Sequence, residues 1–125
     1  MRSNYKKVFW LGFVLCGIAL AQEPLPAMHP ANVAGNWTIS SRGFDGRVET
    51  KTITLNQAGN KITGHFKGPF QSGSLQGTVN AHRIFFRTNT REVLRFRGQI
   101  EGDTIQGTYT IRGRSAEWHA WRTAE

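Results

Sequence analysis

Cysteine is almost absent from this sequence: Cys16 is the only one, and it lies in an apolar run near the N-terminus. The rest of the chain can form no internal disulfide, so a domain there must be held by its core and its backbone hydrogen bonds. Residues 33–122 also lack apolar residues at helical spacing. Acidic residues are few, 8 against 16 Lys and Arg, which gives a formal net charge of +8. A chain of 125 residues has room for one domain.

The only long apolar run, residues 8–21, follows the basic residues Arg2, Lys6 and Lys7. Its length of about 14 residues is short of the roughly 20 that a membrane-spanning helix needs. Because small residues close the run, we interpret residues 1–21 as a signal peptide cleaved after Ala21. A lipoprotein signal is less favoured, since Leu15 precedes Cys16 where a small residue is expected. We therefore expect a bacterial protein that is exported, either to the periplasm or to the medium.

Residues 22–32 contain three prolines and no periodic pattern, which predicts a tether between the signal peptide and a domain at 33–122. From residue 33 onward, short alternating segments are separated by Gly, Asn, Asp and Ser, which predicts strands and tight turns. The predicted strands are 36–42, 47–57, 61–68, 73–80, 82–88, 92–100, 104–112 and 116–122. Connections this short join neighbouring antiparallel strands.

Alternation places apolar side chains on one face of these strands only. The predicted inward positions are Trp37, Ile39, Ile53, Leu55, Ile62, Phe66, Leu75, Val79, Ile84, Phe86, Leu94, Phe96, Ile105, Tyr109, Ile111, Trp118 and Ala120. Four glycines, at 64, 77, 98 and 107, share this parity, where a missing side chain lets a strand coil sharply. Because no amphipathic helix could cover the apolar face, we predict an all-β, eight-stranded antiparallel up-and-down barrel. A two-sheet sandwich is the alternative.

The two ends of this predicted domain resemble the lipocalin-like, or calycin, group, and more distantly the avidin barrel. Gly35-Asn36-Trp37 matches the G-x-W of the first strand, and Arg122 matches the basic residue of the last strand that packs on that tryptophan. The resemblance implies a cup-shaped barrel that holds a small ligand, with Trp37 and Arg122 in a structural closure role. The ligand residues of avidin have no counterparts here, so biotin binding is not carried over.

The inward aromatic residues are the main candidates for a ligand site. Ile39, Phe66, Phe86, Phe96 and Tyr109 would give walls suited to a flat or lipid-like molecule. A barrel of eight strands can equally be filled by its own side chains, so the pattern leaves a cavity and a packed interior both open.

Glu49 and Lys51 share the inward parity at the start of the second strand. If the alternation holds there, they enter the barrel mouth, where they could orient a polar ligand group or, with Tyr109, serve a small isomerase or cyclase. The simpler expectation, which we favour, is that this strand frays before Ile53 and leaves both side chains in water.

The predicted hairpin 82–100 carries Arg83, Arg87, Arg95 and Arg97 on its outer face, with Phe85 and Val93 among them. Basic residues interleaved with an aromatic can bind a polyanion such as lipid head groups or cell-surface polysaccharide, while nucleic acid is a less expected partner. The simpler interpretation, which we favour, is a soluble basic face.

The sequence shows no catalytic or metal motif. The four histidines have no partner at metal-ligand spacing, and no serine lies in a nucleophile elbow. We therefore expect no metal and no cofactor. The leading hypothesis is a non-enzymatic barrel that binds a small hydrophobic or aromatic ligand, followed by a module for anionic envelope material, and third by a barrel enzyme.

Overall fold

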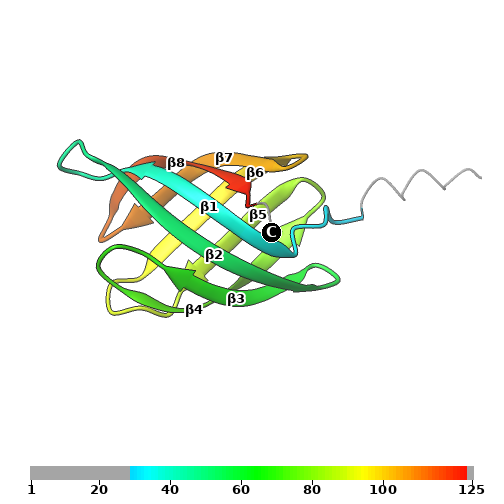
Figure 1. Ribbon diagram of the computed structural model, residues 1–125. Coiled ribbons are helices and arrows are strands. Elements are labelled where there is room, and N and C mark those ends of the chain that lie inside the picture. The colour runs from blue at the N-terminus through cyan, green and yellow to red at the C-terminus, as the bar shows by residue number, and fades with distance from the viewer. Residues whose placement is uncertain (1–28, 124–125) are drawn as a thin grey trace, which may run out of the picture.

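The computed structural model describes residues 29–123, so the predicted signal peptide and residues 22–28 lie outside the described part. The chain forms one closed antiparallel barrel whose strands follow one another in sequence order (Figure 1). The strands are β1 (Gly35–Arg42), β2 (Val48–Ala58), β3 (Lys61–Lys67), β4 (Ser72–Asn80), β5 (Arg83–Thr88), β6 (Leu94–Glu101), β7 (Thr104–Ile111) and β8 (Arg114–Arg122). Within residues 29–123 no helix is long and apolar enough to cross a membrane.

Pairing between the first and last strands closes the barrel. In this antiparallel pair Trp37 lies opposite Arg122, and Ser41 lies opposite Trp118. Every strand therefore has two hydrogen-bonded neighbours and no edge is left free. The predicted all-β barrel is confirmed, and the sandwich alternative is excluded.

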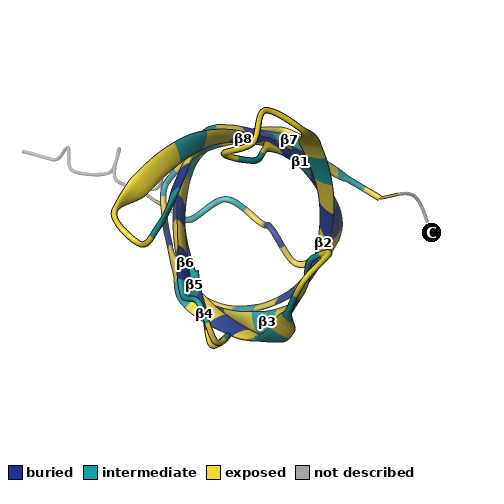
Figure 2. Ribbon diagram, turned by 90° about the vertical axis from the view of Figure 1, so that its left-hand side faces the viewer, coloured by how far each residue is buried: buried dark blue, intermediate teal, exposed yellow. Residues whose placement is uncertain are grey.

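The core follows the predicted alternation. All of the inward positions are buried apart from Ile111, which is half-buried near the end of β7. The outward positions are exposed or half-buried, because successive side chains of a strand point to opposite faces. One apolar lining thus runs around the inside of the barrel. Figure 2 shows buried and exposed residues alternating along the strands.

Glycines let the strands approach each other closely inside the barrel. A Cβ at Gly77 or at Gly107 would lie 1.9 Å from a carbonyl oxygen of the neighbouring strand, that of Phe85 or that of Arg97. No side chain fits such a contact, so the tight coiling of the barrel depends on the missing Cβ atoms.

Two predicted strand starts were wrong by two residues, one because of turn chemistry and one because of hydrogen bonds from another loop, while all other strand boundaries agree within one residue. β8 begins at Arg114, not at 116, because Arg112 and Gly113 both adopt positive φ angles of 51° and 78° and form a two-residue turn. β6 begins at Leu94, not at 92, because Gln71 holds both the backbone N–H and the carbonyl of Glu92. Val93 therefore precedes the strand.

The segment before β1 crosses one end of the barrel (Figure 2). The Ala31 N–H donates to the Ala81 carbonyl, and the Gln57 side chain holds the Ala31 carbonyl and the Val33 N–H. Val33 is fully buried, and its carbonyl accepts the Trp37 indole N–H. This end is consequently plugged by the chain itself.

Arg122 covers Trp37 at the same end. Its guanidinium lies 4.5 Å from the centre of the Trp37 ring and donates to the carbonyls of Ala34 and Asn32, while its Nε contacts Asp103 at 2.9 Å. A planar cation with several donors suits this combined stacking and carbonyl binding.

A candidate ligand pocket at the open end of the barrel

The end opposite the plug holds a pocket of about 460 Å³. Four connections surround it, namely β1–β2, β3–β4, β5–β6 and β7–β8, which all lie at this end because each strand reverses direction. The volume falls within the roughly 300–1,000 Å³ of pockets that hold small molecules. The apolar lining side chains are Phe44, Phe66, Pro69, Phe70, Leu94, Tyr109 and Ile111, and the charged ones are Glu49, Lys51, Arg91, Glu92, Arg112 and Arg114.

Packed aromatic rings form the floor beneath the pocket. The Phe96 ring stacks on Phe86 at 4.7 Å and on Tyr109 at 5.3 Å between ring centres, and meets the Trp118 edge at 5.2 Å. Phe86 and Phe96 are fully buried and do not line the pocket. Packed aromatic side chains therefore fill the middle of the barrel directly below the pocket.

The structure separates the predicted ligand residues into two groups. Phe66, Tyr109, Glu49 and Lys51 line the pocket, whereas Ile39, Phe86 and Phe96 belong to the packed core below it. The alternation of side chains along each strand predicts only that all of these residues point inward. Depth along the barrel, which decides the two groups, depends on the stagger of the strands.

The expectation that β2 frays before Ile53 is wrong. β2 pairs with β1 as far as Val48 opposite Arg42, so Glu49 and Lys51 keep the inward parity. Lys51 is only 4% exposed. Its ammonium group donates to the Glu49 carboxylate at 3.0 Å and to the Ser41 hydroxyl at 2.5 Å.

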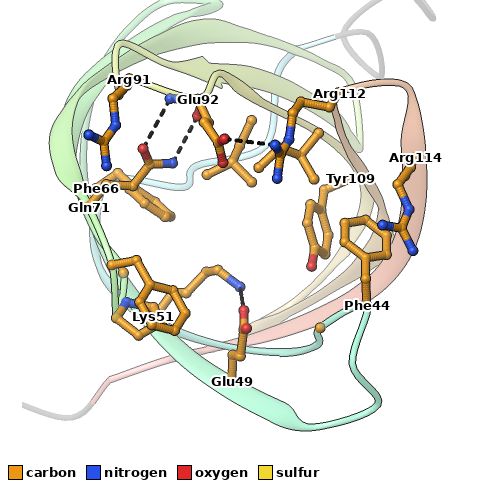
Figure 3. Close-up of a pocket in the computed structure, with 16 residues that line it drawn as sticks. Phe44, Glu49, Lys51, Phe66, Gln71, Arg91, Glu92, Tyr109, Arg112 and Arg114 are labelled. Atoms are coloured by element: carbon orange, nitrogen blue, oxygen red, sulfur yellow. Dashed lines mark hydrogen bonds and ion pairs between the residues drawn. The ribbon is translucent and has the colours of Figure 1, made fainter.

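Lys51 keeps one donor for the pocket. An ammonium group has three N–H bonds, and among residues 29–123 only Ser41 and Glu49 accept from it. The Nζ atom lies 5.1 Å from the centre of the Tyr109 ring. Figure 3 shows the Lys51 and Glu49 head groups meeting inside the opening. Burial of this charge without a partner would be costly, and the carboxylate and hydroxyl offset that cost.

Tyr109 supplies a neutral phenol beside this pair. Its hydroxyl donates to the Arg42 carbonyl at 3.2 Å. Burial raises the pKa of Tyr109 above its usual 10.0, the Ser41 hydroxyl lowers the pKa, and the Glu49 charge raises it. The phenol therefore keeps its proton at neutral pH and acts there as a hydrogen-bonding group.

The rim of the pocket is ordered by contacts between loops. Gln71 of the β3–β4 loop bonds the backbone of Glu92, and the Glu92 carboxylate lies 3.2 Å from the Arg112 guanidinium (Figure 3). The Arg114 guanidinium lies 4.2 Å from the centre of the Phe44 ring. These rim residues could not be predicted from the sequence, because loops carry no period. The predicted up-and-down strand order could have indicated the loops that carry them, because it places every second connection at the same end of the barrel.

The four outer arginines lie away from this pocket. Arg83, Arg87, Arg95 and Arg97 are on the outward face of β5 and β6, and Arg87 lies directly opposite Arg95. None of them lines the open-end pocket.

One solved structure with a similar barrel supports the fold. No protein-family model matches the chain, and no curated protein matches its sequence. A redesigned β-barrel is similar in structure, with a TM-score of 0.64 at 10% identity over 74% of this chain and 91% of that one. A fatty acid binding protein of Schistosoma mansoni, solved in complex with arachidonic acid, has a TM-score of 0.47 at 15% identity over 73% and 96%.

The fold and the site together define a class of protein: a closed eight-stranded β-barrel, plugged at one end and open at the other to a small pocket.

Proposed function

We propose that this protein binds a small, mainly hydrophobic or aromatic molecule in the pocket at the open end of its barrel. The observation that carries the proposal is the pocket itself, about 460 Å³ with aromatic and aliphatic walls around one buried ammonium group. A folded barrel gains stability by filling its interior, so an unfilled pocket with aromatic and aliphatic walls at one end favours a role in binding.

The polar cluster indicates one further feature of the ligand. Lys51 has a free N–H and Glu49 is its partly exposed neighbour, with 24% of the Glu49 side chain accessible. A ligand with one hydrogen-bond acceptor, such as a carbonyl, hydroxyl or carboxylate, would satisfy that donor, while the rest of the molecule contacts Phe66, Leu94 and Ile111. The proposed ligand is thus an apolar molecule with one polar group.

The binding test uses the full chain with the fluorescent probes 1-aminoanthracene, which is neutral, and 8-anilino-1-naphthalenesulfonate, which carries an acceptor group. Ile111→Trp fills the pocket and should weaken both probes at least about tenfold, a loss of roughly 1.4 kcal/mol. Val48→Trp is the matched control, because Val48 is 64% exposed and does not line this pocket. Equal affinity for both variants and the wild type would refute the proposed site.

The polar subsite is tested separately by Lys51→Met with Glu49→Gln, which removes both charges together. We expect the sulfonate probe to lose affinity by about tenfold and 1-aminoanthracene to change by less than about threefold, since only the former needs the Lys51 donor. Equal losses for both probes would contradict the assigned role. Native mass spectrometry of protein from its own source would show whether a molecule of this kind copurifies.

Membership of the calycin group and export remain parts of the proposal. The Gly35-Asn36-Trp37 motif with Arg122 supports the first, and the charged and apolar pattern of residues 1–21 supports the second. The mass of the protein recovered from cell envelope and medium would show whether the chain begins at Gln22.

A further inference from the structure

The outer wall of β4–β7 carries arginines that have no acidic partner. Arg87 and Arg95 lie directly opposite each other, and Arg97 lies opposite Phe85 on the same two strands. Like charges directly opposite each other destabilise a sheet. Among residues 29–123 the ion pairs are Arg47–Asp45, Lys51–Glu49, Arg112–Glu92 and Arg122–Asp103, and none involves this wall.

The strands on either side do not neutralise the arginines. On β4 the outward residues opposite β5 are the neutral Gln76, Thr78 and Asn80. On β7 those opposite β6 are likewise neutral, namely Thr104, Gln106, Thr108 and Thr110. The acidic outward residue of β6, Glu101, lies at the end of that strand opposite Thr104 and, within the described part of the chain, forms no ion pair with the arginines. We name the four arginines together with Phe85, Asn80, Gln99 and Gln106 the arginine wall. It combines uncompensated positive charge with side chains that can both donate and accept hydrogen bonds.

A groove crosses the arginine wall. It has a volume of about 570 Å³, and its sides include Arg83, Arg97, Phe85, Gln99 and Gln106. Its floor includes the backbone of Gly98 and Gly107, which are paired across β6 and β7. Cations, amides and one aromatic ring therefore come together around this groove. The groove shares no lining residue with the open-end pocket.

We propose that the arginine wall binds an acidic polysaccharide, a chain of sugars that bears carboxylate or sulfate groups. Guanidinium groups bind such oxyanions with two parallel hydrogen bonds. Amide side chains such as Gln99 and Gln106 can exchange hydrogen bonds with sugar hydroxyls, and the apolar face of a sugar ring can pack on Phe85. A flexible chain can also follow the convex barrel wall along its groove.

Two other polyanions fit this surface less well. A lipid bilayer is favoured by apolar side chains that insert into it, and Phe85, 36% exposed, is the one large exposed hydrophobic residue of the wall. Single-stranded nucleic acid stacks its bases on successive aromatic rings, whereas the wall offers one ring with the Arg97 guanidinium 5.9 Å from its centre. Positive charge alone does not distinguish the three polyanions, but the groove and the amide side chains of Gln99 and Gln106, here called the amide row, favour the glycan.

The experiment measures binding of the full chain to heparin and to alginate, which are sulfated and carboxylated polysaccharides. The comparison ligands are a poly-deoxythymidine oligonucleotide and vesicles of phosphatidylglycerol with phosphatidylcholine. We expect both glycans to bind more tightly than the comparison ligands, and to weaken about tenfold or more from about 0.05 to about 0.5 M salt. Tighter binding to the oligonucleotide or to the vesicles would overturn the proposal.

The decisive variant is Arg95→Glu with Arg97→Glu, which should weaken glycan binding at least about tenfold. Its matched control is Arg47→Glu with Lys67→Glu, which changes the net charge equally at exposed positions outside the wall. The control should change affinity by less than about threefold. Similar losses in both double variants would show that net charge is sufficient and would overturn the site.

A third variant tests the amide row independently of charge. Gln99→Ala with Gln106→Ala should weaken glycan binding about threefold at both salt concentrations, because hydrogen bonds to hydroxyls are screened little by salt. No change in either condition would overturn the glycan assignment. The probes of the open-end pocket should bind all three variants as they bind the wild type, so failure at one site is distinguishable from failure at the other.

Discussion

Replacing Phe96 by alanine tests the claim that packed aromatic side chains fill the middle of the barrel. Phe96 is fully buried, and its ring contacts Phe86, Tyr109 and Trp118 at centre distances of 4.7, 5.3 and 5.2 Å. Truncation of a buried phenylalanine to alanine costs about 3–5 kcal/mol. Contacts with rings on several sides place this residue near the upper end of that range, at about 4–5 kcal/mol.

That loss is large for a domain of this size. Single domains of about 95 residues have unfolding free energies of roughly 5–14 kcal/mol, and each kcal/mol lowers Tm by about 4–8 °C. We therefore expect Tm to fall by at least about 16 °C in thermal unfolding. Urea unfolding followed by tryptophan fluorescence measures the loss of free energy itself, with the slope of free energy against urea compared with that of the wild type.

Phe85→Ala is the matched control, because Phe85 lies one position from Phe86 on β5 but faces outward and is 36% exposed. Its truncation should cost about 1 kcal/mol or less. If Phe96→Ala does not fold, Phe96→Leu should still cost about 1–2 kcal/mol. Equal losses for the two alanine variants, or a loss below about 1.5 kcal/mol at Phe96, would refute the packed-floor account.

Two further predictions concern backbone crowding and pH. Gly107→Ala should lower the unfolding free energy by about 3 kcal/mol or more, because its Cβ would lie 1.9 Å from the Arg97 carbonyl oxygen. Gly113→Ala has open space around the new Cβ but a φ of +78°, so it should cost about 1–2 kcal/mol. Thermal unfolding that ranks the two variants in reverse order would contradict this. The raised pKa of Tyr109 means that the unfolded chain loses the phenolic proton at a lower pH than the folded chain, so its contribution to stability is complete below about pH 10 and declines as the pH rises through the folded pKa. The unfolding free energy should accordingly fall more steeply above pH 10 in the wild type than in Tyr109→Phe, and parallel curves would show that the folded pKa is not raised.

The strands themselves could be predicted because each carries its own signal. The alternation of Ile53 and Leu55 with threonines, or of Leu94 and Phe96 with arginines, needs no information from elsewhere in the chain. Strand ends were harder to predict. The start of β6 is set by the hydrogen bonds of Gln71 to Glu92, and the start of β8 by the turn at Arg112 and Gly113. Such boundaries depend on a partner that lies across a loop or on the dihedral angles of a turn.

The candidate site was predictable only in part. Lys51 and Glu49 could be placed inside from their parity, but whether the strand held there depended on its pairing with β1. Phe44, Phe70 and Arg114 lie in or beside loops, where no period shows which way a side chain points. Their convergence follows from the fold, not from spacing in the sequence.

By itself, the sequence determined that the described domain has eight strands and which face of each strand is apolar, and it favoured closure of that face on itself over a sandwich. Those properties are local, because side-chain direction in a strand follows a period of two. Only the tertiary structure decided how deep each inward residue lies, and hence that Phe86 and Phe96 fill the barrel while Lys51 and Tyr109 border a pocket. Depth depends on the stagger and tilt of all eight strands together, which no single segment encodes.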